Sequence, residues 1–186
     1  MYETSDLRKN LKILLDGDPY IVIESQFVKP GKGVAFTRTK LRNMITGNVL
    51  ERTFRSGEKI GRADLQEQRL QFLYTDDMYH FMNTETYEQL EISEDFLGDD
   101  RLYLTENLEV DVLFFNMKPI GITLPIFIQV EITETEPGIK GDTAQGATKP
   151  AMISSGAKVM VPLFVNEGDW IKVDTRSREY IERVKR

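Results

Sequence analysis

The stretch Phe27-Val28-Lys29-Pro30-Gly31-Lys32-Gly33-Val34-Ala35-Phe36 joins two apolar runs through a short basic turn, which is the pattern of a β-hairpin. Pro30 fixes φ for the first central position of a tight turn, and Gly31 can supply the positive φ that a type II turn needs at the second. Lys32 then lies at or just past the tip, and Gly33 places no side chain beside it. The pattern predicts a lysine presented to a partner by a turn of Lys29, Pro30, Gly31 and Gly33. The alternative is a tip lysine that is merely solvated, as most are.

The hairpin pattern continues on both sides of this turn. Residues 11–15 and 20–24 alternate around Asp16-Gly17-Asp18-Pro19, and residues 34–41 and 49–55 alternate around Thr46-Gly47-Asn48. We expect the polar face of the second hairpin to carry four cations and to form one basic side of a small barrel. These cations are Arg38, Lys40, Arg52 and Arg55.

The remainder of the chain is also built from short alternating runs, with no helix longer than about two turns. The predicted strands are 70–74, 78–83, 108–114 and 120–124 in the middle of the chain, and 127–132, 158–165, 170–174 and 179–184 at the end. Ser93-Glu94-Asp95-Phe96-Leu97-Gly98 reads as one capped helical turn ending in glycine. The sequence therefore predicts an all-β protein of three small β-barrel domains, at residues 1–64, 65–127 and 128–186.

Charge is distributed unevenly over these three parts. Residues 1–64 carry 12 Lys and Arg against 8 Asp and Glu, a net charge of +4. Residues 65–127 carry 3 against 13, a net charge of −10, and residues 128–186 carry 9 of each. Because potentials decay over a Debye length of about 10 Å, each part presents its own field. We expect the first part to face phosphate. The alternative is that a solvated surface has acquired this charge bias by sequence drift.

Composition argues against several classes of protein. The chain has no cysteine, which removes disulfides and thiolate metal sites and is consistent with a reducing compartment. The first residues lack the basic and apolar regions of a secretory signal, and no apolar run approaches the roughly 20 residues that span a bilayer. We therefore expect a cytoplasmic protein with no membrane partner.

The single histidine, His80, has no second histidine or cysteine with which to form a metal site or a nucleophile pair. We interpret it as structural. Carboxylates are plentiful, but without a histidine partner or a nucleophile motif a hydrolase is disfavoured. The sequence thus predicts a protein that is not an enzyme and has no catalytic residue, metal or cofactor.

Residues 138–150 form a long polar segment between two predicted strands. Loops above roughly 12 to 15 residues are more often functional or disordered than incidental, and the glycines in this one let backbone amides approach a ligand. The segment lacks the Gly-Lys-Ser/Thr ending of a phosphate loop. A tolerated insertion remains an equal alternative.

Four stretches together resemble the bacterial elongation factor P family over essentially the whole chain. They are Lys29–Gly33, Arg38–Asn43, Gly141–Ala144, and the run from Val161–Val165 to Ile171–Arg176. The resemblance implies a KOW/SH3-like barrel followed by two OB-folds in an L-shaped arrangement like that of transfer RNA. It also implies a monomeric translation factor that enters the ribosome between the peptidyl and exit sites, contacts both subunits, and relieves stalls at consecutive prolines.

The resemblance assigns roles to particular residues. Lys32 matches the lysine that contacts the CCA end of the peptidyl-tRNA and that a modifying enzyme commonly extends with β-lysine or an aminopentanol group. The expected contacts with RNA backbone are Arg38, Lys40 and Arg42. The expected exit-site codon loop comprises Gly141, Asp142, Thr143 and Gly146, and the expected small-subunit contacts are Tyr180 and Arg183.

Two alternatives to this interpretation remain open. The paralogous elongation-factor-P-like proteins share the fold but do not reliably share the lysine turn, so Pro30-Gly31-Lys32-Gly33 favours the factor itself. A general RNA-binding OB protein should present aromatic residues on a basic barrel face. The strongly acidic middle part argues against this second alternative.

Overall fold

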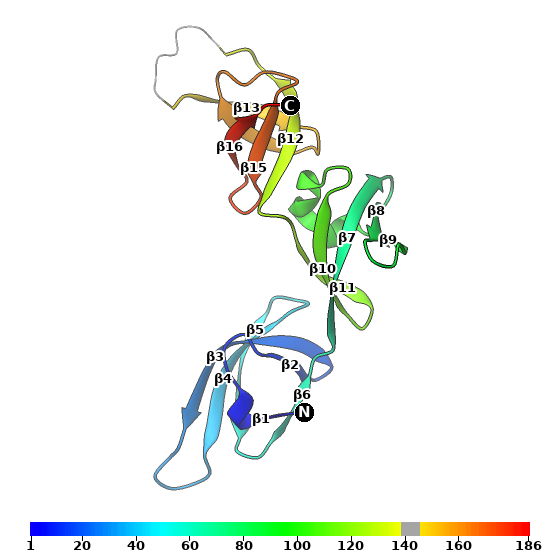
Figure 1. Cartoon of the computed structure of the whole chain (residues 1–186). Coiled ribbons are helices and arrows are strands. Elements are labelled where there is room, and N and C mark those ends of the chain that lie inside the picture. Colours follow the sequence, from blue (N-terminus) through cyan, green and yellow to red (C-terminus); the bar gives the residue numbers. More distant parts are fainter. Residues whose placement is uncertain (139–145) are drawn as a thin grey trace. The chain divides into compact units, whose positions relative to one another are not determined.

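The computed structural model describes residues 1–138 and 146–186. Its regular structure is almost entirely β, in three curled sheets, which confirms the predicted all-β class (Figure 1). The chain divides into two compact units. The first comprises Met1–Glu67 and Val112–Gly121, and the second comprises Gln68–Asp111 and Ile122–Arg186.

The N-terminal sheet has the strand order β1-β6-β2-β3-β4-β5. Its strands are β1 (Tyr2–Glu3), β2 (Lys12–Leu15), β3 (Asp18–Val28), β4 (Phe36–Asn43), β5 (Val49–Arg55) and β6 (Lys59–Arg62), and η1 (Thr4–Asp6) is a 3-10 turn. β3 is one strand of 11 residues with a bulge between Val22 and Glu24, where we expected a shorter run. The core of the N-terminal sheet consists of Leu7, Leu11, Ile13, Val22, Leu41, Phe54 and Ile60.

The central sheet has the order β11-β10-β7-β8-β9. Its strands are β7 (Leu65–Thr75), β8 (Tyr79–Asn83), β9 (Gln89–Ile92), β10 (Glu109–Phe115) and β11 (Lys118–Thr123). The prediction missed β9, which has only 4 residues.

The helical segments of the central part are α1 (Glu94–Leu97) and the 3-10 helix η2 (Gly98–Tyr103). The Phe96 amide donates to Ser93 Oγ at 3.3 Å, and Gly98 has a φ of 53°, so the predicted capped turn is confirmed. No helix in the described residues is long and apolar enough to cross a bilayer.

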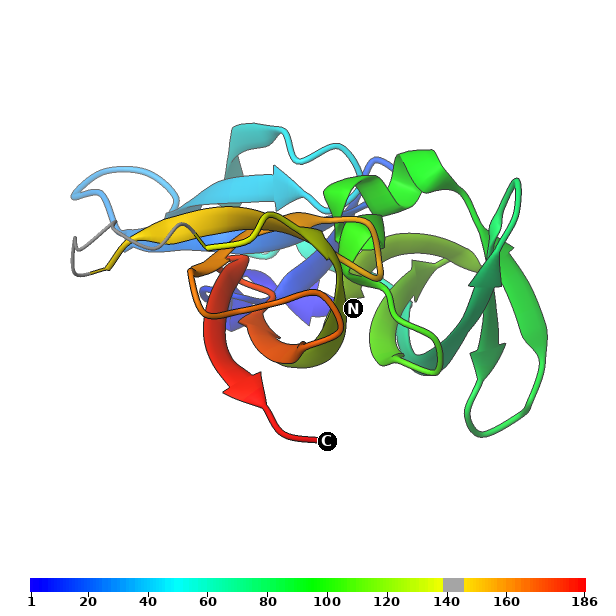
Figure 2. The same ribbon diagram turned by 90° about the horizontal axis from the view of Figure 1, so that it is seen from above.

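The C-terminal sheet has the order β14-β13-β12-β15-β16 and curls on itself (Figure 2). Its strands are β12 (Phe127–Thr135), β13 (Thr148–Ile153), β14 (Lys158–Pro162), β15 (Trp170–Asp174) and β16 (Glu179–Val184). β13 corrects the expected loop over 138–150, because it pairs with both β12 and β14 and begins at Thr148.

The C-terminal core includes a residue from the central part of the chain. Tyr103, at the end of η2, is only 4% exposed and packs among the apolar side chains of β12, β13 and β15. The Arg178 guanidinium lies over the Tyr103 ring at 5.5 Å and pairs with Asp99 at 3.5 Å. The η2 segment and the C-terminal sheet therefore share one core within the second unit.

Candidate functional site

Lys32 lies in the loop that joins β3 to β4, at the far end of a two-stranded arm (Figure 1). The ladder closes at the pair Val28 and Phe36, which leaves residues 29–35 as the connecting loop. Lys32, Gly31 and Gly33 are all exposed. Within the described part of the chain Lys32 makes no hydrogen bond, ion pair or ring contact. Its ammonium group is therefore free to meet a partner outside the protein.

The loop is not the type II turn that the sequence predicted. Gly31 does not have the positive φ expected of it, whereas Gly33 has a φ of 108°. The prediction was wrong because a tight turn needs the strands to close next to it, and here the ladder stops at Val28. The glycine that the backbone requires is the one after Lys32.

Three predicted cations lie on one face of the arm, on β4. Arg38, Lys40 and Arg42 alternate with the buried Thr39 and Leu41, so they point to the opposite side from the core. Of the four cations expected on one face, namely Arg38, Lys40, Arg52 and Arg55, the placement of Arg52 was wrong. Arg52 pairs with Thr39 and therefore lies on the core-side face, where it covers the Phe54 ring at 5.4 Å.

The error for Arg52 follows from strand periodicity. Residues 52 and 55 are three apart, and side chains alternate with a period of two, so they cannot share a face. Arg55 pairs with Phe36, two residues before Arg38 on β4, and therefore lies on the face of Arg38 and Lys40.

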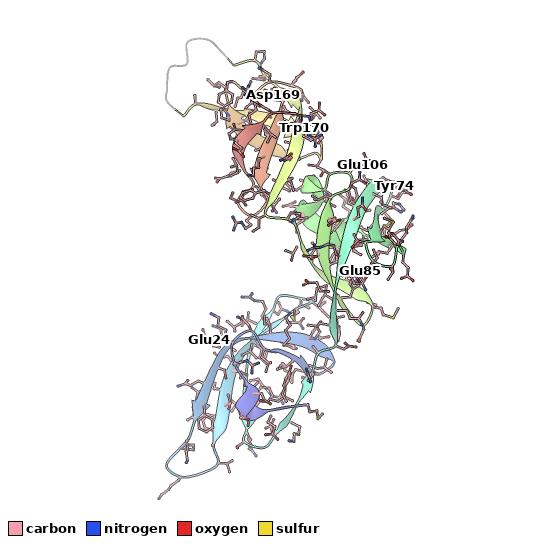
Figure 3. All side chains as sticks on the ribbon, viewed as in Figure 1. Glu24, Tyr74, Glu85, Glu106, Asp169 and Trp170 are labelled. Atoms are coloured by element: carbon pink, nitrogen blue, oxygen red, sulfur yellow. The ribbon has the colours of Figure 1, made fainter. Side chains whose placement is uncertain are left out.

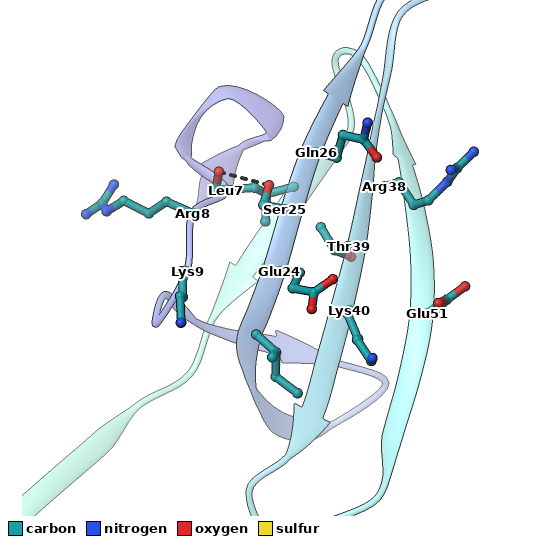
Figure 4. Close-up of a pocket in the computed structure, with 11 residues that line it drawn as sticks. Leu7, Arg8, Lys9, Glu24, Ser25, Gln26, Arg38, Thr39, Lys40 and Glu51 are labelled. Atoms are coloured by element: carbon teal, nitrogen blue, oxygen red, sulfur yellow. Dashed lines mark hydrogen bonds between the residues drawn. The ribbon is translucent and has the colours of Figure 1, made fainter.

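A cleft of about 600 Å³ opens on this basic face. It is bounded by β3, β4 and β5 and by the segment that follows η1, and Figure 4 shows the side chains along it. The hydroxyl of Ser25 donates to the Leu7 carbonyl at 3.2 Å and ties that segment to β3. The segment adds Arg8 and Lys9, two cations that sequence reasoning missed because they precede the first predicted hairpin.

The cleft is positive but not uniformly so. Four cations line it, namely Arg8, Lys9, Arg38 and Lys40, against the two carboxylates Glu24 and Glu51. None of these six groups forms an ion pair with another residue that the structure describes. Cations that are not held in ion pairs can bind phosphate oxygens, and the carboxylates between them can accept from the hydroxyl groups of a ribose. The cleft thus has the chemistry of a site for a sugar-phosphate backbone.

Most of the predicted exit-site codon loop lies outside the described residues, namely Gly141, Asp142 and Thr143. Gly146 is described, and it is exposed with a φ of 84°. At the base of this loop Lys149 is buried on β13 and its Nζ donates to the Glu136 carbonyl at 2.5 Å.

The two predicted small-subunit contacts lie on β16 and differ in environment. Tyr180 is half-buried and packs against the C-terminal core. Arg183 is exposed, lies over the Phe164 ring at 5.2 Å and faces Asp169 at 3.7 Å. Arg183 has the more accessible group, because its guanidinium stands at the surface beside an exposed aromatic ring.

The turn between β15 and β16 is organised by Asp174. Its carboxylate accepts from Arg176 Nη2 at 2.9 Å, from the Arg176 amide at 2.8 Å and from the Ser177 amide at 3.3 Å. These hydrogen bonds, with the Arg176 side chain foremost, lower the pKa of Asp174 to about 2. The carboxylate therefore stays charged at neutral pH and holds the start of β16 in place.

His80 sits on β8, where its Nε2 lies 2.8 Å from Asp76 Oδ1 and its ring stacks on Tyr74 at 4.3 Å. Hydrogen bonding to the Met78 amide and then to His80 lowers the pKa of Asp76. In the described residues no group of three or more His, Cys, Asp or Glu side chains is arranged to hold a metal ion.

Comparison with known proteins identifies the family. Three family models match in succession: Elongation factor P (EF-P) KOW-like domain over residues 3–60, Elongation factor P (EF-P) OB domain over 65–122, and Elongation factor P, C-terminal over 128–183. Elongation factor P of Natranaerobius thermophilus is 54% identical over 186 residues, covering 100% of this chain and 99% of the relative. That of Syntrophus aciditrophicus is also 54% identical, and both chains are covered completely.

Among solved structures, eukaryotic translation initiation factor 5A from Methanococcus jannaschii is similar to this chain at 25% identity and a TM-score of 0.54. The match covers 66% of this chain and 93% of that one. The sheets, the KOW-like and OB domain matches and the full-length relatives agree with one another. The chain belongs to the elongation factor P family and is a translation elongation factor.

Proposed function

We propose that this protein binds the ribosome between the peptidyl and exit sites and stimulates peptide-bond formation at consecutive prolines. Lys32 reaches the CCA end of the peptidyl-tRNA and holds it in a reactive geometry. The ribosome performs the chemistry, and the factor lowers the entropic part of the barrier by positioning one reactant. The protein acts as a cytoplasmic monomer and is not itself an enzyme.

The observation that carries this proposal is the environment of Lys32. An exposed lysine without a protein partner, at the end of an arm and next to a left-handed glycine, is suited to reach into a narrow site. The cleft beside β4 supports it, because Arg8, Lys9, Arg38 and Lys40 offer a track for RNA backbone. Arg42 continues that face beyond the cleft.

The same proposal extends to the rest of the chain. The segment around Gly146 contacts the exit-site codon, and Tyr180 and Arg183 contact the small subunit. The protein thus contacts both ribosomal subunits. A modifying enzyme extends Lys32, which the free ammonium group permits. Intact-mass spectrometry of the protein from its native host would detect the added group, and an unshifted mass would contradict the modification.

A reconstituted translation system with a polyproline reporter tests the proposal. Lys32→Ala should abolish rescue of the stalled reporter and leave the thermal unfolding midpoint unchanged, because an exposed loop side chain contributes less than about 0.5 kcal/mol to stability. Lys29→Ala is the matched control, since it removes one positive charge from the same loop. Equal losses in the two variants would indicate that only the charge of the loop matters, and full rescue by Lys32→Ala would refute the proposal.

A further inference from the structure

A second cavity, of about 820 Å³, lies within the second unit, between the central sheet and the C-terminal sheet. One wall comes from β7, β8, η2 and the segment that follows η2. The other comes from β12, the turn between β13 and β14, β15 and Arg186. Figure 3 shows Tyr74 and Glu106 on the first side and Trp170 on the second. A cavity of this size is in the range of small-ligand sites, which often form between domains.

The two walls of the cavity are fixed to each other. Tyr103 is buried in the C-terminal core, and Leu102 beside it comes within 3.7 Å of the Cβ position of Gly156. Arg178, which has a φ of 61°, follows β15 in the chain. It pairs with Asp99 of η2 and lies over the Tyr103 ring, so it also links η2 to the C-terminal sheet. The cavity is therefore a formed feature of the second unit.

Several polar groups in the cavity lack a protein partner. The Gln129 amide and the indole N–H of Trp170 make no hydrogen bond with any residue that the structure describes. The Ser155 hydroxyl is inaccessible and is also without a partner in that part of the chain. Buried polar groups are normally hydrogen-bonded, and the Ser155 hydroxyl is an exception. Gln129 is exposed and Trp170 is partly buried, so their amide and N–H groups are open to the acceptors and donors of a ligand.

The aromatic rings in the cavity are arranged as stacking surfaces. Tyr74 is 54% exposed, and one of its faces already stacks on His80. The Arg186 guanidinium lies 3.7 Å from the centroid of the Trp170 ring. Faces of this kind bind nucleobases in sequence-tolerant single-strand sites.

The charge of the cavity is opposite to that of its surroundings. Residues 65–127 carry a net charge of −10, yet the cavity is lined by two arginines and one glutamate. Arg101 is held by Glu94 at 3.0 Å and by the Gly98 carbonyl at 2.7 Å. Among residues 1–138 and 146–186, the only partner of Arg186 is the Trp170 ring, so its guanidinium is available for an anion.

We propose that this cavity binds one unpaired nucleotide of RNA, an assignment that rests on the proposed ribosomal function for the choice of RNA as partner. The base takes the place of Arg186 on the face of Trp170 and stands near Tyr74. Its polar edge bonds to Gln129, and the released Arg186 pairs with the phosphate. The described lining offers no base-specific set of bidentate partners, so the site accepts purines and pyrimidines alike.

The fluorescence of Trp170 tests this proposal, because it is the only tryptophan in the chain. Adenosine 5′-monophosphate, uridine 5′-monophosphate and a short single-stranded oligoribonucleotide should each quench the emission in a saturable way. The oligoribonucleotide should bind more tightly than either mononucleotide. Tyr74→Ala should raise the dissociation constant about fivefold to a hundredfold, from the usual contribution of one aromatic stacking partner. Gln129→Ala should raise it about threefold to tenfold.

Tyr87→Ala is the matched control, since Tyr87 is a 70% exposed tyrosine in the turn between β8 and β9 and does not line the cavity. It should bind as the wild type does, and so should Lys32→Ala. Quenching that does not saturate, or that Tyr74→Ala and Tyr87→Ala weaken equally, would overturn the assignment. The titration contains no ribosome, so it can fail while polyproline rescue succeeds, and the two proposals are tested separately.

Discussion

Replacing each of the two glycines beside Lys32 by alanine should have opposite consequences. Gly33 has a φ of 108°, a backbone conformation that alanine rarely adopts. Gly31 does not lie in that region, and a Cβ placed there meets no atom within 4 Å. The two substitutions add the same methyl group on either side of the same lysine, so each is a control for the other.

The cost of Gly33→Ala follows from the backbone conformation of residue 33 alone. A Cβ at Gly33 would approach Pro30 Cγ at 3.9 Å, which is ordinary contact, so no clash adds to the conformational penalty. Holding a residue other than glycine at positive φ costs about 1–2 kcal/mol. The exposed loop will avoid this cost by moving, and the conformation that presents Lys32 will become about 5- to 30-fold less populated.

The assay is the rate of proline–proline bond formation as a function of factor concentration. Gly33→Ala should need about 5- to 30-fold more protein than the wild type for the same rate. Gly31→Ala should need within about twofold of the wild-type protein concentration. Alanine at a position with a compatible φ causes no strain and lowers the conformational entropy of the unfolded chain. A Gly33→Ala variant as active as the wild type, or a Gly31→Ala variant impaired as severely as Gly33→Ala, would refute a requirement for positive φ at residue 33.

Three further predictions concern the rest of the molecule. Tyr103→Ala should lower the free energy of unfolding in urea by roughly 3 kcal/mol or more, because it removes a large side chain from the C-terminal core. It should also speed amide exchange in β12 and β15, although β10 and β11 separate Tyr103 from these strands along the chain. Unchanged exchange in β12 and β15 would contradict the shared core. The pKa of Asp174 is lowered from 3.8 to about 2, so its contribution to stability is present above pH 4 and lost as pH falls toward 2, and Asp174→Asn should remove that part of the acid dependence; carboxyl NMR giving an ordinary midpoint would refute this. Arg38→Ala and Lys40→Ala should each reduce the slope of log affinity for transfer RNA against log salt by about 0.7–0.9, and Glu51→Gln should tighten binding; salt slopes equal to the wild-type slope would remove the cleft from the RNA interface.

Local patterns in the sequence predicted much of the fold. The hairpin of β4 and β5, the cap at Ser93 and the three sheets follow from alternation and turn residues, which act over a few positions. The strands β6 and β9 were missed because each has 4 residues, too few for a clear period. β13 was missed for a different reason. Its inward positions include Lys149 and Ala151, so pairing with β12 and β14, rather than an apolar alternation, makes it a strand.

The site was predicted in part. The sequence located Lys32 at the end of a hairpin, but the conformation of the loop depends on where the β3–β4 ladder stops, which is a long-range property. The same ladder brings Arg38 and Lys40 beside Arg8 and Lys9, about 30 residues away along the chain. No local pattern links those two pairs, so the cleft could be found only from the folded sheet.

The most direct test of the proposed role of Lys32 is a single-turnover measurement on ribosomes that carry a peptidyl-tRNA ending in proline. The rate of transfer to prolyl-tRNA should rise with the wild-type protein and stay at the factor-free value with saturating Lys32→Ala, while transfer between phenylalanines is unaffected by either. Binding of Lys32→Ala to the ribosome should persist through Arg38, Lys40 and the rest of the basic face. A saturating Lys32→Ala variant that accelerates the proline–proline step as much as the wild type would contradict the account.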